Sequence, residues 1–360
     1  MAKVHVNTAF LAGNIMVKLI IKFTIGEIMV MIYDQIEFHN VEEITATDKG
    51  CLLSRLPLSI ARQLNEGIPN SRTYMGAGVE LRFRMPKREV TLHLRADANE
   101  EAQTALIYFG SIQGGWQYSS KTIGEQDTAL HIPYPENMDE MERISQKAGL
   151  SFSPWLVRVL LPYGTCYYLG KEGETLPPLS GDEPTACYLA YGSSITHGSL
   201  GLVTPLTYVF RITSILGTDC LNQGYAGCAH MERTMAEYLV SRKDWTFASL
   251  EMGVNMLGTE LTDEAYEKRI CDFLQPFKED DRPVFVTDIF TKNGGNRKRA
   301  EVFREIVRRN TEGSRLIYTP GKELLSQPEY ISADMTHPTL EGQMQVAQRW
   351  SEVMRRAYDG

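Results

Sequence analysis

Residues 186–196 read ACYLAYGSSIT, in which an apolar run over residues 186–191 is followed by one glycine and two serines. The run predicts a buried strand, and after it short apolar segments alternate with helical patterns of roughly ten or more residues. This alternation is typical of βαβ units around a parallel sheet, whose active sites lie at the carboxyl ends of the strands. The expected strands are Ala186–Tyr191, Asp219–Asn222, Phe247–Met252, Pro283–Ile289 and Arg315–Tyr318, and the expected helices are Pro205–Leu216, Met231–Val240, Asp263–Phe277, Arg297–Arg309 and Leu340–Tyr358.

The stretch from residue 32 to residue 168 reads mainly as strands. Several segments alternate apolar with polar residues, as in Glu80–Met85 (ELRFRM) and Val90–Arg95 (VTLHLR). Alternation with a period of two predicts strands with one buried and one solvent-exposed face, as in an antiparallel sandwich. The expected strands are Gln35–Val41, Gly50–Leu56, Val79–Arg84, Val90–Arg95, Thr104–Ile112 and Trp155–Leu161, with one helix near Asp139–Ala148.

Between Gly170 and Pro184 the composition shifts to Gly, Glu, Pro, Ser and Asp, which is typical of a linker. A chain of 360 residues is long for a single core. We therefore expect two domains, a β-sandwich over residues 32–178 and an α/β domain over residues 184–360.

Residues 1–31 are expected to be a non-native or disordered extension. Their apolar run is divided by Lys18, Lys22 and Glu27 into pieces too short to span a bilayer. No small-residue cleavage site of a signal peptide follows it. Translation is then expected to begin at Met29 or Met31, and a weakly secreted precursor is the alternative.

The composition is that of a soluble globular protein, with a net charge of −8 and a pI near 5.5. An acidic chain with interleaved charges argues against a nucleic-acid partner, and we expect no membrane partner either. The six cysteines lie far apart without a C-x-x-C pair, so we expect mostly buried free thiols in a cytoplasmic protein. The histidine spacing fits no metal motif, and neither a metal nor another cofactor is expected. Homo-oligomerisation is left open.

Four short segments of the second half lie at predicted strand ends or in late loops. They are Gly192–Thr196 (GSSIT), Asn222–Gly227 (NQGYAG), Glu251–Asn255 (EMGVN) and Asp334–Pro338 (DMTHP). A serine at a tight turn can act as a nucleophile, and glycine or asparagine can place N–H donors at a developing oxyanion. An Asp three residues before a His can fix the imidazole's tautomer. Each segment taken singly is equally well explained as a turn or a helix cap.

Together, in this order and spacing, the four segments resemble the conserved blocks of the SGNH (GDSL-type) hydrolases, over about half of the chain. The resemblance implies a flavodoxin-like, three-layer α/β/α domain with serine esterase activity. It implies Ser194 as nucleophile, His337 as general base and Asp334 as the residue that orients it. The implied oxyanion donors are the backbone N–H groups of Ser194 and Gly227 and the side-chain amide of Asn255.

This sequence departs from the family pattern at Ser193, where the first block usually has an Asp. Ser193 is the rival nucleophile and otherwise a candidate substrate contact. His197 and His230 lie near the first and second blocks and are expected to line the pocket. Cys228 lies next to the second block.

The strand-rich half resembles the jelly-roll-like β-sandwich modules that precede some GDSL-type sugar esterases and acyltransferases; Arg55-Leu56-Pro57 and Val79–Met85 carry this resemblance. Trp116 is predicted either to stack on a sugar or to pack between the two domains. Three hypotheses follow: an esterase for short acyl groups, chiefly acetyl groups on a carbohydrate, an acyltransferase with the same nucleophile, and a carbohydrate-binding protein without activity.

Overall fold

The computed structural model describes residues 3–7, 20–25, 28–97, 103–118 and 120–358. The chain divides into two units. One combines Met1–Leu56 with Tyr74–Thr185, and the other combines Pro57–Thr73 with Ala186–Gly360. Each unit is described by itself.

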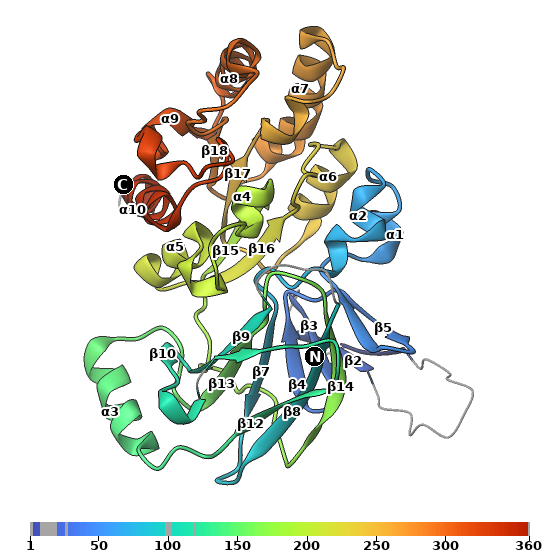
Figure 1. Ribbon diagram of the computed structural model, residues 1–360, viewed down its shortest axis with the longest axis vertical. Helices are drawn as coiled ribbons and strands as arrows, with labels where there is room; N and C mark the ends of the chain where they lie inside the picture. Colours follow the sequence, from blue (N-terminus) through green and yellow to red (C-terminus); the bar gives the residue numbers. More distant parts are fainter. Residues whose placement is uncertain (1–2, 8–19, 26–27, 98–102, 119, 359–360) are drawn as a thin grey trace. The chain divides into compact units, whose positions relative to one another are not determined.

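The second unit is built on a five-stranded parallel sheet with the order β16-β15-β17-β18-β19 (Figure 1). In chain order this is 2-1-3-4-5, the flavodoxin-like arrangement. The strands are β15 (Cys187–Gly192), β16 (Asp219–Gly224), β17 (Phe247–Glu251), β18 (Val284–Thr287) and β19 (Ile317–Thr319). Every residue of β16, β17 and β18 is buried, as expected for a parallel sheet covered on both faces.

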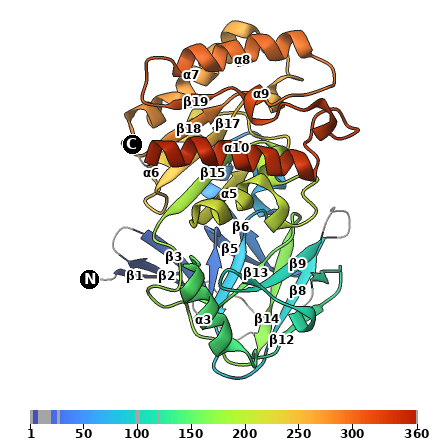
Figure 2. The same ribbon diagram turned by 90° about the vertical axis from the view of Figure 1, so that its left-hand side faces the viewer.

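Helices cover both faces of this sheet, so the predicted three-layer α/β/α architecture is confirmed. Helix α10 packs beside α5 on one side, and α6, α7 and α8 pack in succession on the other (Figures 1 and 2). Their bounds are α5 (Tyr208–Leu216), α6 (Arg233–Ser241), α7 (Asp263–Glu279), α8 (Arg297–Thr311) and α10 (Leu340–Tyr358), with the short α9 (Gly321–Leu324) before α10. Between α5 and α10, Trp350 of α10 is fully buried and its ring stacks on that of Tyr208 of α5.

The first unit is an antiparallel β-sandwich, as predicted. One sheet has the order β1-β2-β3-β4-β7-β13-β9-β10, with β11 paired to β9, and the other has the order β12-β8-β14-β6-β5. Apolar residues of both sheets form one core. In it, the rings of Phe38 and Tyr168 pack edge to face, with their centroids 5.2 Å apart. The bounds are β1 (Lys3–Asn7), β2 (Ile20–Ile25), β3 (Ile28–Tyr33), β4 (Ile36–His39), β5 (Glu43–Thr47), β6 (Gly50–Ser54), β7 (Glu80–Arg84), β8 (Val90–Ala96), β9 (Thr104–Phe109), β10 (Ile112–Gln113), β11 (Lys121–Thr122), β12 (Thr128–Ile132), β13 (Leu156–Leu160), β14 (Cys166–Glu172) and the helix α3 (Met138–Ala148).

Residues 1–31, predicted to be a non-native or disordered extension, include three strands that the structure describes. Strands β1, β2 and β3 pair antiparallel with one another, and β3 pairs with β4 of the sandwich. The rest of the predicted extension lies outside the described residues. That residues 1–31 are a non-native extension stays a prediction.

Strand β7 corrects the expectation of one wet face. Glu80 and Arg82, the polar members of the alternation, are 1% and 0% exposed. Glu80 accepts charge-assisted hydrogen bonds from Arg82 and from Arg158 of β13 at 2.6 to 2.8 Å. Burial acts to raise the pKa of Glu80, but the two guanidinium groups outweigh it and hold that pKa at about 2. The alternation in β7 therefore reflects two buried faces of the strand. One face is apolar, and the other carries paired charges.

The segment Pro57–Thr73 lies within the predicted β-sandwich domain in sequence but packs with the α/β unit. It contains the short helices α1 (Leu58–Ala61) and α2 (Gly67–Asn70), and it ends in the turn η1 (Arg72–Tyr74). Figure 1 shows α1 and α2 beside α6, which α1 contacts. The sandwich strands before and after it, β6 and β7, stay in the first unit, so the α/β unit is assembled from two separate parts of the chain.

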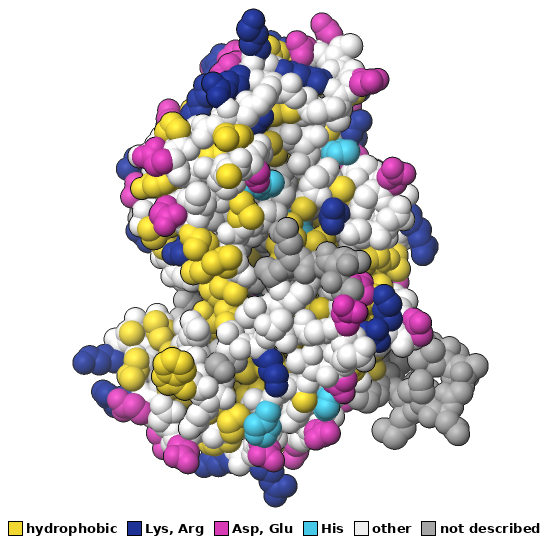
Figure 3. Space-filling view, viewed as in Figure 1, with side chains coloured by type: hydrophobic (Ala, Val, Ile, Leu, Met, Phe, Trp, Pro, Cys, Tyr) yellow, Lys and Arg dark blue, Asp and Glu magenta, His cyan; other side chains and the backbone are white. Residues whose placement is uncertain are grey.

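All six cysteines are free: two are buried, three are half-buried and Cys271 is exposed, which is fewer buried thiols than predicted. On the face shown in Figure 3, acidic and basic side chains are interspersed. Among the described residues, no helix combines the length and the apolar character that a membrane crossing requires.

Candidate active site

The predicted nucleophile lies at the turn that follows β15. Ser194 is the first residue of the short helix α4 (Ser194–His197), and the Oγ of Ser193 caps this helix by accepting the Ile195 N–H at 3.1 Å. A Cβ at Gly192 would lie 2.1 Å from Thr196 Oγ1 and 2.6 Å from Glu251 Oε2, so only glycine fits there. The turn thus presents the half-buried Ser194 and turns Ser193 inward.

Ser194, His337 and Asp334 form a continuous chain of hydrogen bonds, although 143 residues separate the serine from the histidine. Ser194 Oγ lies 2.6 Å from His337 Nε2, and His337 Nδ1 lies 2.5 Å from Asp334 Oδ2. With Nδ1–H directed to the carboxylate, Nε2 is left to accept the serine proton. This is the arrangement that activates a serine hydroxyl as a nucleophile.

Several donors converge on the Asp334 carboxylate. Oδ1 accepts the backbone N–H groups of Thr336 and His337, both at 2.9 Å, and the Ser332 hydroxyl at 2.7 Å. Partial burial acts to raise the pKa of Asp334, but these bonds and the one to the imidazole hold it well below its usual range. These hydrogen bonds therefore favour the ionised form of Asp334.

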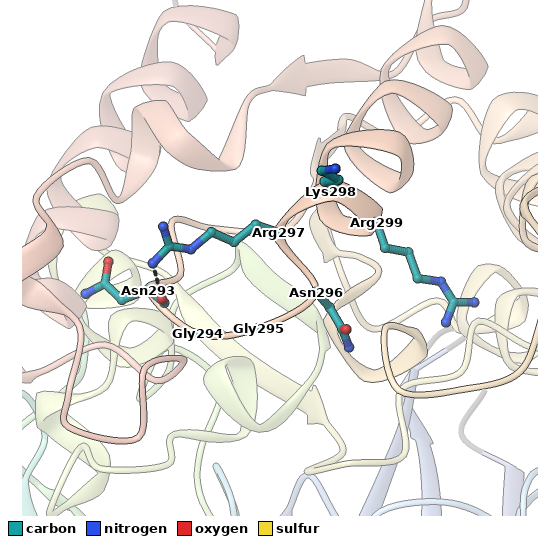
Figure 4. A pocket seen from close by; sticks show the side chains of 7 residues that line it. All are labelled: Asn293, Gly294, Gly295, Asn296, Arg297, Lys298 and Arg299. Atoms are coloured by element: carbon teal, nitrogen blue, oxygen red, sulfur yellow. Dashed lines mark hydrogen bonds between the residues drawn. The ribbon is translucent and has the colours of Figure 1, made fainter.

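The loop that carries Asp334 and His337 is braced by the segment Asn293–Arg299. Met335, which lies between the two in a left-handed conformation (φ 65°), accepts hydrogen bonds on its carbonyl from Asn293 N–H at 2.9 Å and Gly294 N–H at 3.1 Å. Figure 4 shows the Arg297 side chain reaching back to Asn293, where it donates to the carbonyl, while Arg299 points the other way. These contacts brace the largely exposed loop that carries Asp334 and His337.

The second-block turn is held against the first. Asn222 Nδ2 donates to Thr196 O at 2.9 Å, and Tyr225 N–H donates to Gly192 O at 2.8 Å. Gly224 approaches the backbone of His197 so closely that a Cβ would lie 2.2 Å from its nitrogen. Gly227 follows with φ 72° in the exposed part of the turn, and a Cβ there would meet nothing within 4 Å. The space around Gly227 is therefore open, and its left-handed conformation favours glycine. A backbone N–H that donates to an oxyanion needs such open space.

The third block orients its asparagine. Asn255 lies in the turn η4 (Val254–Met256), directly after Gly253 with φ 106°. Its Oδ1 accepts the Ala229 N–H at 3.1 Å, which comes from the turn that carries Gly227. Because the oxygen is engaged, the Nδ2 amide is the group that Asn255 offers to a ligand.

A buried carboxylate lies beside the nucleophile turn. Glu251, the last residue of β17, is 1% exposed, and its Oε2 accepts the Ser193 N–H at 2.6 Å and the Thr196 hydroxyl at 3.2 Å. Its Oε1 has no hydrogen-bond partner among the described residues. Burial raises the pKa of Glu251, and the bonds from Ser193 and Thr196 offset only part of that rise. Glu251 thus places a buried acidic group against the backbone of Ser193.

This raised pKa predicts a pH-dependent stability. The folded protein holds the Glu251 proton more tightly than the unfolded chain, so the free energy of unfolding falls as pH rises above the ordinary value of 4.5 towards the raised one. Glu251→Gln cannot ionise, and we expect its stability to fall less than that of wild type over this window. Urea denaturation at a series of pH values between about pH 5 and pH 8 measures the difference. Parallel stability curves for the two proteins would contradict the assignment.

The remaining predicted site residues lie in different settings. Ser193 and His197 are 1% and 2% exposed; Ser193 caps α4, and His197 Nδ1 accepts the Ala226 N–H at 3.4 Å, so both are placed for a structural role rather than a substrate contact. His230 is half-exposed, with Nε2 3.2 Å from Gly227 O, beside the second-block turn. Trp116, in the first unit, is 97% exposed.

Sequence reasoning missed the contributions of Glu251, Ala229 and the segment Asn293–Arg299, which contacts the loop that carries Asp334 and His337. For Glu251 a signal existed, because a carboxylate ends an otherwise apolar strand (FASLE). For the other two there is no local signal, since their contribution is a backbone contact with a distant loop. Within the described residues, no group of three or more His, Cys, Asp and Glu side chains is placed to hold a metal ion.

Comparison with known proteins gives a consistent fold. No protein-family model and no curated protein sequence matches this chain. Among solved structures, the salicylyl-acyltransferase SsfX3 from a tetracycline biosynthetic pathway aligns with a TM-score of 0.69 at 16% identity, over 90% of this chain and 95% of that one. A putative GDSL-like lipase from Bacteroides ovatus aligns with a TM-score of 0.61 at 16% identity, over 90% and 98%.

A family two carbohydrate esterase from Cellvibrio japonicus aligns with a TM-score of 0.59 at 10% identity, over 100% of this chain and 99% of that one. These alignments span both units of the chain. The chain therefore has the fold of the SGNH/GDSL-type hydrolases, together with an antiparallel β-sandwich, as its four sequence blocks indicate.

Proposed function

We propose that this chain is a serine esterase of the SGNH type that hydrolyses short acyl esters, chiefly acetyl esters of a carbohydrate. The observation that carries the proposal is the chain of hydrogen bonds from Ser194 through His337 to Asp334, at 2.6 and 2.5 Å. Donor groups at Gly227 and Asn255 lie on the two neighbouring strand-end turns, which contact each other through Ala229. Nucleophile, base, orienting carboxylate and oxyanion donors are the complete set for acyl transfer.

The proposed reaction starts with attack of Ser194 Oγ on the ester carbonyl carbon, while His337 Nε2 takes the hydroxyl proton. The carbonyl electron pair moves to oxygen, which accepts hydrogen bonds from Ser194 N–H, Gly227 N–H and Asn255 Nδ2. Each such donor contributes about 3 kcal/mol to stabilising the transition state. Collapse of this intermediate expels the alcohol, which takes its proton from His337. Water then attacks the acyl-enzyme in the same way and releases the acid.

The substrate class is supported by the esterase neighbours. The Cellvibrio japonicus structure is a carbohydrate esterase, and an acetyl xylan esterase from Butyrivibrio proteoclasticus aligns with a TM-score of 0.52 at 12% identity. The fully exposed indole of Trp116, in a Gly-Gly-Trp loop of the sandwich, supplies an apolar face of the kind that stacks on a sugar ring. A carbohydrate-binding protein without activity is disfavoured, because all three triad residues are present and in contact.

An acyltransferase is the second candidate, favoured by the alignment with a salicylyl-acyltransferase. The two functions share the acyl-enzyme and differ in whether water or an alcohol takes the acyl group. Product analysis with p-nitrophenyl acetate in the presence and absence of an added sugar or polyol separates them. Acetylated polyol as the main product identifies a transferase, and free acetate in both reactions identifies a hydrolase.

The experiment that tests the shared chemistry is covalent labelling of the wild-type protein. A fluorophosphonate probe is expected to modify one residue, Ser194, as located by mass spectrometry of the labelled peptide, and p-nitrophenyl acetate is expected to be turned over. Competition by the ester substrate should protect against labelling. Modification at Ser193, or an unlabelled protein without turnover, would contradict the proposal.

A further inference from the structure

A side chain from outside the four sequence blocks contacts the oxyanion turn. Arg72, at the end of the segment Pro57–Thr73, donates from Nε to the carbonyl oxygen of Ala226 at 2.8 Å. That carbonyl belongs to the same peptide unit as the Gly227 N–H. Arg72 thus binds the C=O side of the peptide unit whose N–H is the proposed oxyanion donor.

The geometry of the peptide makes this contact informative. In a planar trans peptide the C=O and N–H point in opposite directions, so fixing the oxygen also fixes the direction of the hydrogen. A charge-assisted hydrogen bond to the oxygen also polarises the amide, which strengthens the N–H as a donor. Both effects act on the oxyanion without contact between Arg72 and the substrate.

This peptide is one whose orientation needs support. Gly227 is exposed and has no side chain to pack, and its φ of 72° leaves the backbone with the freedom that glycine brings. The preceding residue, Ala226, donates its own N–H only at 3.4 Å, to His197 Nδ1. Without a partner on the Ala226 carbonyl, rotation of the peptide would move the donor away from the oxyanion.

The segment that presents Arg72 is itself fixed to the same turn. Asn65 donates from Nδ2 to Cys228 O at 2.9 Å and to Glu232 Oε1 at 2.8 Å, and its backbone N–H also reaches Glu232. Gly67 packs so closely on Cys228 that a Cβ there would lie 2.4 Å from the sulfur. The segment that carries Arg72 is therefore also anchored to Cys228, the residue after Gly227, and to Glu232.

We propose that Arg72 is a positioning residue of the oxyanion hole, which aligns and polarises the Ala226–Gly227 peptide. The inference rests on the proposed function, and it gives the segment Pro57–Thr73 a role in catalysis. The residue acts through the backbone and is not a catalytic residue.

The test compares Arg72→Gln with Arg62→Gln, which makes the same change of charge at an exposed arginine of the same segment. We expect Arg72→Gln to lower kcat on p-nitrophenyl acetate by roughly 10- to 100-fold with little change in KM, because a misplaced donor weakens only transition-state binding. Arg62→Gln should have the kcat of wild type. Arg72→Lys, which keeps a cation, should lie between, and ethylguanidinium added to Arg72→Ala should restore part of the rate.

Two further readouts separate positioning from folding. The Gly227 amide resonance in ¹⁵N-labelled protein should shift in Arg72→Gln but not in Arg62→Gln, and the melting temperatures of the three proteins should show whether the fold is kept. An unshifted Gly227 resonance, or an unchanged kcat in Arg72→Gln, overturns the inference and leaves the esterase proposal intact. Loss of kcat accompanied by an equal loss of folded protein overturns it as well. A wild type without labelling or turnover overturns both.

Discussion

Ser194→Ala is expected to lower kcat on p-nitrophenyl acetate by about a million-fold, as loss of a triad nucleophile does in serine hydrolases. The variant removes the only oxygen that lies 2.6 Å from His337 Nε2 in the described structure, so no acyl-enzyme can form. Binding and the oxyanion donors remain, and they should leave a residual rate above that of the uncatalysed reaction. Steady-state kinetics with highly purified variant protein measure the loss.

Ser193→Ala is the matched control, because it deletes the same hydroxyl one residue earlier. Ser193 Oγ caps α4, so this variant should lose about 1 kcal/mol of stability, seen as a lower melting temperature, while it keeps its nucleophile and its probe labelling. If Ser193→Ala were inactive at full stability and Ser194→Ala active, the nucleophile would have to be reassigned to Ser193.

Asp334→Asn is expected to lower kcat by about ten-thousand-fold while the fold is retained. An asparagine can keep the Oδ1 bonds from Ser332, Thr336 and His337, so the loop should hold its conformation. At the Oδ2 position, however, an NH₂ group would donate to Nδ1 and hold the imidazole with its proton on Nε2. That tautomer cannot accept the Ser194 proton. Kinetics and fluorophosphonate labelling rates should fall together.

Ser332→Ala provides the comparison for Asp334→Asn. It removes one donor to Asp334 Oδ1 and leaves the carboxylate and its bond to His337 in place. We expect a much smaller loss of kcat than in Asp334→Asn. Similar losses in both variants would mean that the loop conformation, and not the imidazole tautomer, is what Asp334 supplies.

Much of the fold is readable from local patterns, because each pattern reports burial along its own element. The run Ala186–Tyr191 is wholly apolar and becomes the inner strand β15, which pairs with β16 on one side and with β17 on the other. The helix expected at Asp139–Ala148 becomes α3, ended by Gly149 in a left-handed conformation. The strands β5, β12 and β14 were not predicted, since they are short or mixed in polarity and depend on their neighbours in the sheet.

Where burial depends on a partner from another strand, the local pattern misleads. Glu80 and Arg82 alternate with apolar residues as surface residues do, yet both are buried, and Glu80 accepts hydrogen bonds from Arg82 and from Arg158 of β13. Ser193 lies beside the predicted nucleophile, which suggests a contact with substrate. It is buried instead, because its N–H donates to the Glu251 carboxylate and its Oγ accepts the Ile195 N–H. In both cases one of the contacting groups, Arg158 or Glu251, lies tens of residues away in the chain.

By itself, the sequence determined the parallel-sheet domain and the candidates for its chemistry, because strand ends of such a sheet must share one edge and three of the four blocks follow predicted strands. Only the tertiary structure decided that Ser194 and His337 lie 2.6 Å apart, that Glu251 is a buried acid, and that Arg72 reaches the peptide before Gly227. The physical reason is that hydrogen-bond distance and burial are properties of chain segments brought together by packing. No periodicity within one segment records its partner in another.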